Sequence, residues 1–126
     1  MGLDQYAYRV KKSAIVNDLK FEGKIDGKDS YEEIYYWRKV PNLQGWMENL
    51  YREKGGDKVF DCEYVRLDMD DLMQLKHDVV NGKLPETEGF FFGRHFEEDM
   101  PSVLEFIEKA KEIIEDGDAV YYSSWW

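Results

Sequence analysis

Strand-like and helix-like hydrophobic periods alternate along this chain, and that alternation restricts the folds open to it. Residues 4–10 (DQYAYRV) place Tyr6, Tyr8 and Val10 on one side, which is the two-residue period of a half-buried strand. Three further strand-like runs follow, at 32–39, 59–67 and 118–126. Between them, apolar residues recur at helical spacing in three segments, beginning near Pro41, Asp68 and Asp99. The order predicts an α+β fold, with a mixed sheet of about five strands and about three helices packed on it.

Local signals give the expected ends of the helices. Pro41 suits a first helical turn, and Gly55-Gly56 is a natural stop for the helix that follows it. Asp68 is a candidate N-cap for the second helix. Asp99 is a candidate N-cap for the third, with Pro101 in its first turn. The polar stretch 11–30 is interpreted as a loop, or an insertion holding a weak hairpin.

The stretch 89–93 (GFFFG) supplies the remaining expected strand. Side chains alternate along a strand, so Phe91 must oppose Phe90 and Phe92. Burial of both faces requires a central position in the sheet, or a cover over Phe91. That cover is a helix of this chain, a ligand or another protein subunit.

Length and charge limit the class of protein. A chain of 126 residues fits a single domain, here 1–126, that folds without disulfides or metals. The net charge of −10 repels nucleic acid and anionic membranes, so neither is an expected partner. A basic protein surface or a cationic ligand fits that field better, although many proteins are this acidic without a charged partner.

One cysteine, Cys62, excludes an intramolecular disulfide and favours a reducing compartment. Its neighbours Asp61 and Glu63 disfavour the thiolate, so a nucleophilic role for Cys62 is not expected. We find neither a leader peptide nor an apolar run long enough to span a bilayer. A cytoplasmic location is expected, with no membrane association.

The first candidate binding site is Trp37-Arg38-Lys39. An arginine fork can hold a carboxylate or phosphate while an aromatic ring stacks beside it. The alternative is a strand end whose cations pair with the abundant carboxylates of the same chain. A second candidate, Arg94 with His95, could complete such a ligand site beside the aromatic strand.

No metal or cofactor is expected. The acidic residues after His95 are contiguous, and contiguous ligands seldom converge on one ion. The acidic run at 68–71 lacks the glycine and distal glutamate of a calcium loop. His77 has no partner at a spacing recognisable for catalysis, and no nucleophile, zinc or phosphate-loop motif occurs. Enzymatic activity is therefore not favoured.

The aromatic C-terminus is the candidate interface. Tyr121, Trp125 and Trp126, together with Phe91, could form a patch that binds another protein. Closure of the sheet is the preferred interpretation of the C-terminal run, and a second copy of the chain could cover one face of the strand at 89–93. The favoured function is a small acidic accessory protein that binds a protein partner. The alternatives are a small-ligand or anion binder, or an enzyme, using Arg38, Lys39 and His95, and a homo-oligomeric structural module.

Four local signatures resemble a family of small phage and bacterial proteins. They are MGLDQYAYRVKK, IYYWRK, LPETEGFFFG and YYSSW, and they span nearly the whole chain. No activity, cofactor or catalytic residue is established for that family, so the resemblance implies none here. Such phage sequences sometimes carry the label phosphoglycerate kinase. The length excludes the two nucleotide-fold lobes of that enzyme, and no glycine-rich phosphate loop is present.

Overall fold

The computed structural model describes residues 2–85 and 96–126. Within them, an α+β fold is built on a four-stranded sheet of order β6-β1-β8-β7. The strands are β1 (Asp4–Val10), β6 (Tyr31–Arg38), β7 (Tyr64–Leu67) and β8 (Ala119–Trp125). The helices are α1 (Pro41–Glu53), α2 (Met69–Val80) and α3 (Phe96–Glu115). The predicted fold class is confirmed.

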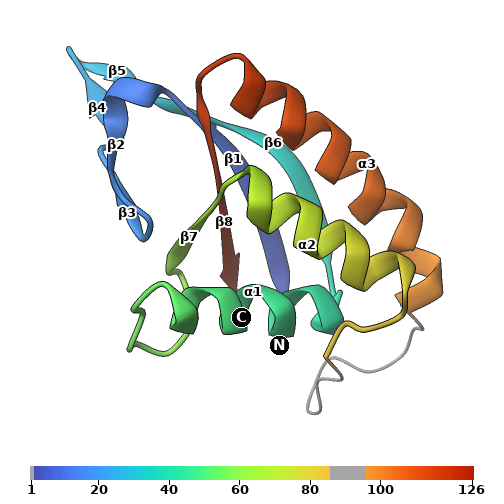
Figure 1. Cartoon of the computed structure of the whole chain (residues 1–126). Coiled ribbons are helices and arrows are strands. Elements are labelled where there is room, and N and C mark those ends of the chain that lie inside the picture. Colours follow the sequence, from blue (N-terminus) through green and yellow to red (C-terminus); the bar gives the residue numbers. More distant parts are fainter. Residues whose placement is uncertain (1, 86–95) are drawn as a thin grey trace.

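The expectation of a mixed sheet is wrong, because all three strand pairings in the main sheet are antiparallel. Figure 1 shows why: α1 runs across the end of the sheet, so the chain enters β7 from the end at which it left β6. Two helices, α2 and α3, then separate β7 from β8. α2 takes the chain from the end of β7 back toward the α1 end of the sheet, and α3 takes it to the opposite end again. β8 therefore runs opposite to β7.

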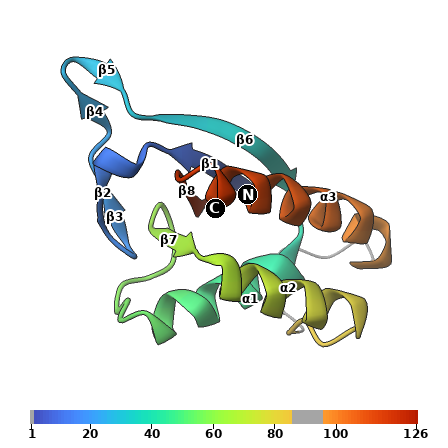
Figure 2. The same cartoon turned by 45° about the horizontal axis from the view of Figure 1, so that its top comes forward.

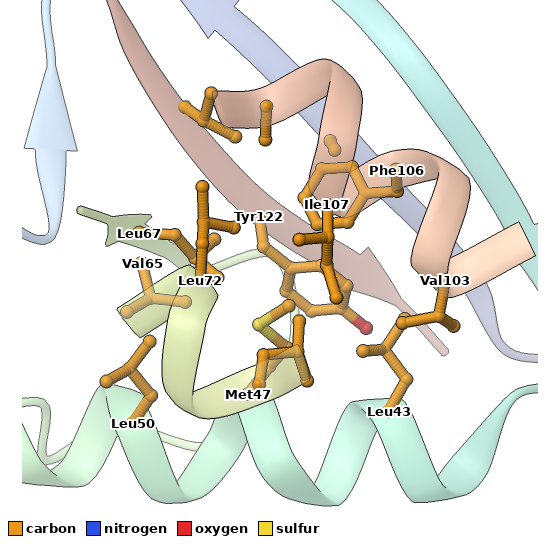
Figure 3. Packing of buried hydrophobic residues seen from close by; sticks show 14 of the residues in the cluster. Leu43, Met47, Leu50, Val65, Leu67, Leu72, Val103, Phe106, Ile107 and Tyr122 are labelled. Carbon is orange, nitrogen blue, oxygen red and sulfur yellow. The ribbon is translucent and has the colours of Figure 1, made fainter. Parts of the chain in front are cut away.

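All three helices pack on one face of the sheet (Figure 2). Figure 3 shows the core between them, with the ring of Tyr122 in the middle of side chains from α1 and α3. Burial of this kind is the main stabilising term for a small domain. The labelled members of the core are Leu43, Met47, Leu50, Val65, Leu67, Leu72, Val103, Phe106, Ile107 and Tyr122.

A chain of buried hydrogen bonds crosses this core. Gln5 accepts from the backbone N–H of Val40 at 2.9 Å and donates to the Val40 carbonyl at 3.0 Å. Its amide also donates to the Tyr122 hydroxyl at 2.9 Å, which in turn donates to Gln44 at 2.6 Å. Gln44 completes the chain by donating to the Phe60 carbonyl at 3.3 Å. The network ties β1, the start of α1, β8 and the loop before β7 together, and it satisfies polar groups that burial would otherwise penalise.

The polar stretch 11–30 holds more structure than a loop. It contains η1 (Lys12–Ala14) and two short hairpins, β2 (Ile15–Asn17) with β3 (Lys20–Phe21), and β4 (Lys24–Ile25) with β5 (Lys28–Asp29). Asp26 and Gly27 both have positive φ at the tip of the second hairpin. An Asp-Gly pair is the usual sequence for such a two-residue turn.

Three of the predicted boundaries hold and one fails. α1 begins at Pro41 and ends at Glu53, just before Gly55-Gly56, and α2 has Asp68 as its N-cap, as predicted. The prediction that Asp99 caps the third helix is wrong, because α3 already begins at Phe96 and Pro101 lies inside it. Proline removes one helical hydrogen bond, and here it does so close to the helix start, where few of these bonds exist.

The strand expected at 59–67 is shorter than predicted. Only Tyr64–Leu67 pairs with β8, and Cys62 has a φ of 60°, which is not extended backbone. The predicted strand at 89–93 lies outside the described residues.

Candidate functional site

Among the described residues, 2–85 and 96–126, only the hairpins of 11–30 cover the second face of the sheet, opposite the helices, and they cover one end of it. The hairpins of 11–30 pack there, with Ile15, Phe21 and Ile25 in one apolar cluster with Tyr121. At the other end, two cross-strand rows carry side chains on this face, because residues in register lie side by side. The first row is Arg38, Asp4 and Trp125, and the second is Tyr36, Tyr6 and Ser123.

These rows present large exposed side chains. Trp125 is 61% exposed and Tyr36 is 46% exposed, and the side chain of Arg38 is 62% exposed. We call Tyr6, Tyr36, Arg38 and Trp125 the open-face patch. Aromatic and arginine side chains are the types most enriched where proteins bind one another.

Contacts inside the patch hold its members in place. The rings of Tyr6 and Tyr36 lie 5.3 Å apart, and the Tyr36 hydroxyl donates a hydrogen bond to the Asp4 carboxylate. That hydrogen bond raises the pKa of Tyr36 above its ordinary value, because it favours the protonated phenol. Arg38 Nε lies 4.0 Å from Asp4 Oδ1. Asp4 is thus the common partner of both side chains from β6.

A pocket of about 230 Å³ lies at the edge of the patch. It is lined by Gly2, Asp4, Trp125 and Trp126, and we call it the Trp pocket. Trp126 is fixed by two hydrogen bonds: its indole donates to the Phe60 carbonyl at 2.9 Å and its backbone N–H donates to Asp61 at 3.1 Å. The pocket therefore combines a fixed indole, a second and more exposed indole, and a carboxylate.

The structure does not bring the predicted Trp37-Arg38-Lys39 site together on one surface. Trp37 is 4% exposed and lies on the helix face, against Phe106 and with its indole donating to Ser102 Oγ at 3.2 Å. Side chains alternate along β6, so Arg38 points to the other face. Lys39 follows the end of β6, with a φ of 58° and an exposed side chain. Tyr36, two residues before Arg38, is the aromatic residue that shares its face.

The predicted interface residues also separate. Tyr121 is fully buried under the β2–β3 hairpin, with its hydroxyl donating to the Asn17 carbonyl at 2.6 Å, so it offers no free surface. Trp125 and Trp126 are accessible. Phe91, Arg94 and His95 lie outside the described residues, so the interface role of Phe91 and the ligand-binding role of Arg94 and His95 stay predictions.

Cys62 is exposed but poorly suited to nucleophilic chemistry. Partial burial, the adjacent Asp61 carboxylate and Glu63 all raise the pKa of its thiol. Within residues 2–85 and 96–126, no group of three His, Cys, Asp or Glu side chains is placed to hold a metal ion. Over the same ranges, no helix has the length and apolar character needed to cross a bilayer.

Another hollow, of about 510 Å³, lies between the β2–β3 hairpin and the end of α1. It contains Lys54, whose ammonium group already binds Asp71 at 2.5 Å and the Arg66 carbonyl at 2.6 Å. Lys54 joins β7 to the cap of α2 and is not available to a ligand. Its role is structural.

Sequence reasoning missed Asp4, Tyr6 and Tyr36 as site residues. The alternation of residues 4–10 was itself visible, and it placed Tyr6 on one face of its strand. The pairing of β1 between β6 and β8 was not visible, and only that pairing puts Asp4 between Arg38 and Trp125.

No protein-family model matches the chain, and neither a curated protein nor a solved structure matches it significantly. The site is therefore interpreted from its own chemistry.

Proposed function

We propose that this chain is a small accessory protein that binds another protein through the open-face patch. The observation that carries the proposal is the exposure of Tyr36, Arg38 and Trp125 on one face of the sheet, opposite the three described helices. Exposed aromatic clusters of this kind mark interaction sites in monomeric proteins. A cytoplasmic location and membership of the phage and bacterial family are parts of the same proposal.

Charge supports a protein partner with basic groups. Asp4 lies against Tyr36 and Arg38 of the patch, and Asp61 holds Trp126 at the adjoining Trp pocket. The chain as a whole carries a net charge of −10. Complementary charge speeds association and fixes orientation more than it adds affinity. Nucleic acid is disfavoured, since the phosphate backbone would meet this negative field.

The test compares two matched surface variants in affinity capture from a bacterial cytosolic lysate at moderate salt. Tyr36→Ser with Trp125→Ser removes the aromatic surface of the patch. Met73→Ser with Val80→Ser removes similar exposed apolar surface from α2, on the other side of the molecule. We expect a specific partner that the α2 variant retains and the patch variant loses. Equal recovery by both variants, or no specific partner, contradicts the proposal.

Two further observations decide between kinds of partner. Sedimentation that shows a dimer, lost in the patch variant, makes the partner a second copy of this chain. Capture of oligonucleotide by the wild type would contradict the charge argument.

An anion binder is the second candidate, favoured by the exposure of Arg38 beside Tyr36. Here Arg38→Gln decides the question. An anion site loses its binding in this variant, whereas binding of a basic partner is retained or strengthened because a competing cation next to Asp4 is gone.

A further inference from the structure

We infer that the Trp pocket binds a cationic group, such as the quaternary or primary ammonium of a modified or unmodified lysine. This inference rests on the proposed function, because it names the side chain by which a protein partner would be anchored at the patch. The pocket is lined by two indoles and one carboxylate, Trp125, Trp126 and Asp4.

The chemistry of the lining is that of an ammonium site. The face of an indole attracts a cation more strongly than the face of any other side chain, and a carboxylate adds a direct charge. The pocket has a volume of about 230 Å³, and Gly2 is its fourth lining residue. A neutral apolar ligand of the same shape would be buried in the same way, but it would lack both the attraction to the indole faces and the attraction to the carboxylate.

The pocket is built before a ligand arrives. Trp126 is held through both its indole N–H and its backbone N–H. Asp4 is held by the Tyr36 hydroxyl from β6 and lies in register with Trp125 of β8. Groups that are already ordered lose less entropy on binding, which favours affinity.

Arg38 is the cation already present at the rim. Its Nε lies 4.0 Å from Asp4 Oδ1, and its side chain reaches close to Gly2. This distance and the high exposure of Arg38 describe a weak surface ion pair. An incoming ammonium group therefore competes with Arg38 for Asp4. Removing the guanidinium should strengthen cation binding.

In the experiment, the full chain is titrated with tetramethylammonium chloride at constant ionic strength. Isothermal titration calorimetry measures the binding. tert-Butanol, a neutral molecule of nearly the same shape, is the matched control ligand. We expect saturable binding of tetramethylammonium in the millimolar range and little binding of tert-butanol. Equal binding of the two, or no saturable binding of the cation, overturns the inference.

Four variants then assign the site. Asp4→Asn and Trp125→Leu should each weaken cation binding about five- to tenfold. Arg38→Gln should strengthen it by about twofold or more. Trp46→Phe, whose indole bonds to Asp78 away from the pocket, should change nothing. Loss of binding in Arg38→Gln, or unchanged binding in Trp125→Leu, contradicts the assignment.

Thermal unfolding of each variant excludes loss of structure as the cause. Trp125→Leu keeps an apolar side chain at an exposed position, so it tests the pocket even if Asp4→Asn proves unstable. Failure of cation binding leaves the partner proposal standing if the patch variant still loses its captured protein. Failure of both tests rejects the surface as a binding site.

Discussion

The hydroxyl of Tyr36 donates a hydrogen bond to the carboxylate of Asp4 across the β1–β6 pair, and this bond organises the exposed end of the sheet. It fixes the Asp4 carboxylate on β1, between β6 and β8, which carry the exposed side chains of Arg38 and Trp125. Asp4 lines the Trp pocket and lies against Tyr36 and Arg38 of the open-face patch, and Trp125 belongs to both, so the pocket and the patch adjoin.

This hydrogen bond predicts an altered titration of Tyr36. The acceptor Asp4 raises the pKa of Tyr36 above the ordinary tyrosine value of about 10. Stability from the bond is therefore present below that ordinary value and is lost as the pH rises through the raised pKa. In Asp4→Asn, NMR titration of the tyrosine ring carbons should show the Tyr36 pKa falling toward its ordinary value. An unchanged Tyr36 titration would show that the bond does not form.

The buried network around Gln5 should be essential for stability. In Gln5→Leu, the N–H and C=O of Val40 and the Tyr122 hydroxyl lose a partner, at a cost of about 2–4 kcal/mol in the free energy of unfolding. Tyr122→Phe leaves the Val40 bonds intact and should cost less, about 1 kcal/mol or somewhat more. Urea denaturation measures both. A Gln5→Leu variant as stable as the wild type would refute the network's importance.

The cap of α2 predicts a specific pH dependence. Burial tends to raise the pKa of Asp68, but the Asp71 N–H and the Lys54 ammonium outweigh it, so the pKa is lowered. The stability this contributes is present above the ordinary aspartate value of about 3.9 and is lost as the pH falls through the lowered pKa. Asp68→Asn keeps a capping side chain without the charge.

Denaturation of wild type and Asp68→Asn across the acid range tests this account. The wild type should be the more stable protein near neutral pH, and the difference should shrink as the pH falls below about 4. A difference that is constant with pH would mean that the Asp68 charge contributes nothing.

Gly56 should tolerate no side chain. A Cβ placed there would overlap the ring of Tyr51, which is packed in the core against Phe60. We expect Gly56→Ala to destabilise the protein by about 1–3 kcal/mol through overpacking. Gly23→Ala is the matched control, because the nearest atom to its added Cβ, on Tyr31, lies 3.8 Å away. Equal unfolding midpoints for the two variants would contradict this packing.

The sequence predicted the elements better than their arrangement. Periodicity located β1 and α1 because each has one buried face of regular spacing, and Asp68 was visible as a cap from its place before an apolar run. Strand direction was missed because it depends on α1 crossing the end of the sheet, which no local pattern encodes. The Asp26-Gly27 pair indicates a tight hairpin turn within the polar stretch, which the prediction of a loop or weak hairpin only partly captures.

The candidate site was predicted only in part. Trp125 and Trp126 were named from their composition and position, and Arg38 from its chemistry. Trp37 was predicted to share a site with Arg38, but the strand period places the two side chains on opposite faces of the sheet, and Trp37 is buried. Asp4 could not be found from sequence, since its role arises from register with two strands that are distant along the chain.

The indole N–H signals of the four tryptophans test the central claim most directly. Trp37 and Trp46 are internal controls, since their indoles bond to Ser102 and Asp78 away from the patch. In a proton–nitrogen NMR titration with tetramethylammonium at constant ionic strength, the account predicts saturable shifts of the Trp125 and Trp126 signals, with Trp37 and Trp46 unchanged. Shifts of equal size at all four signals, or none at Trp125 and Trp126, would contradict it.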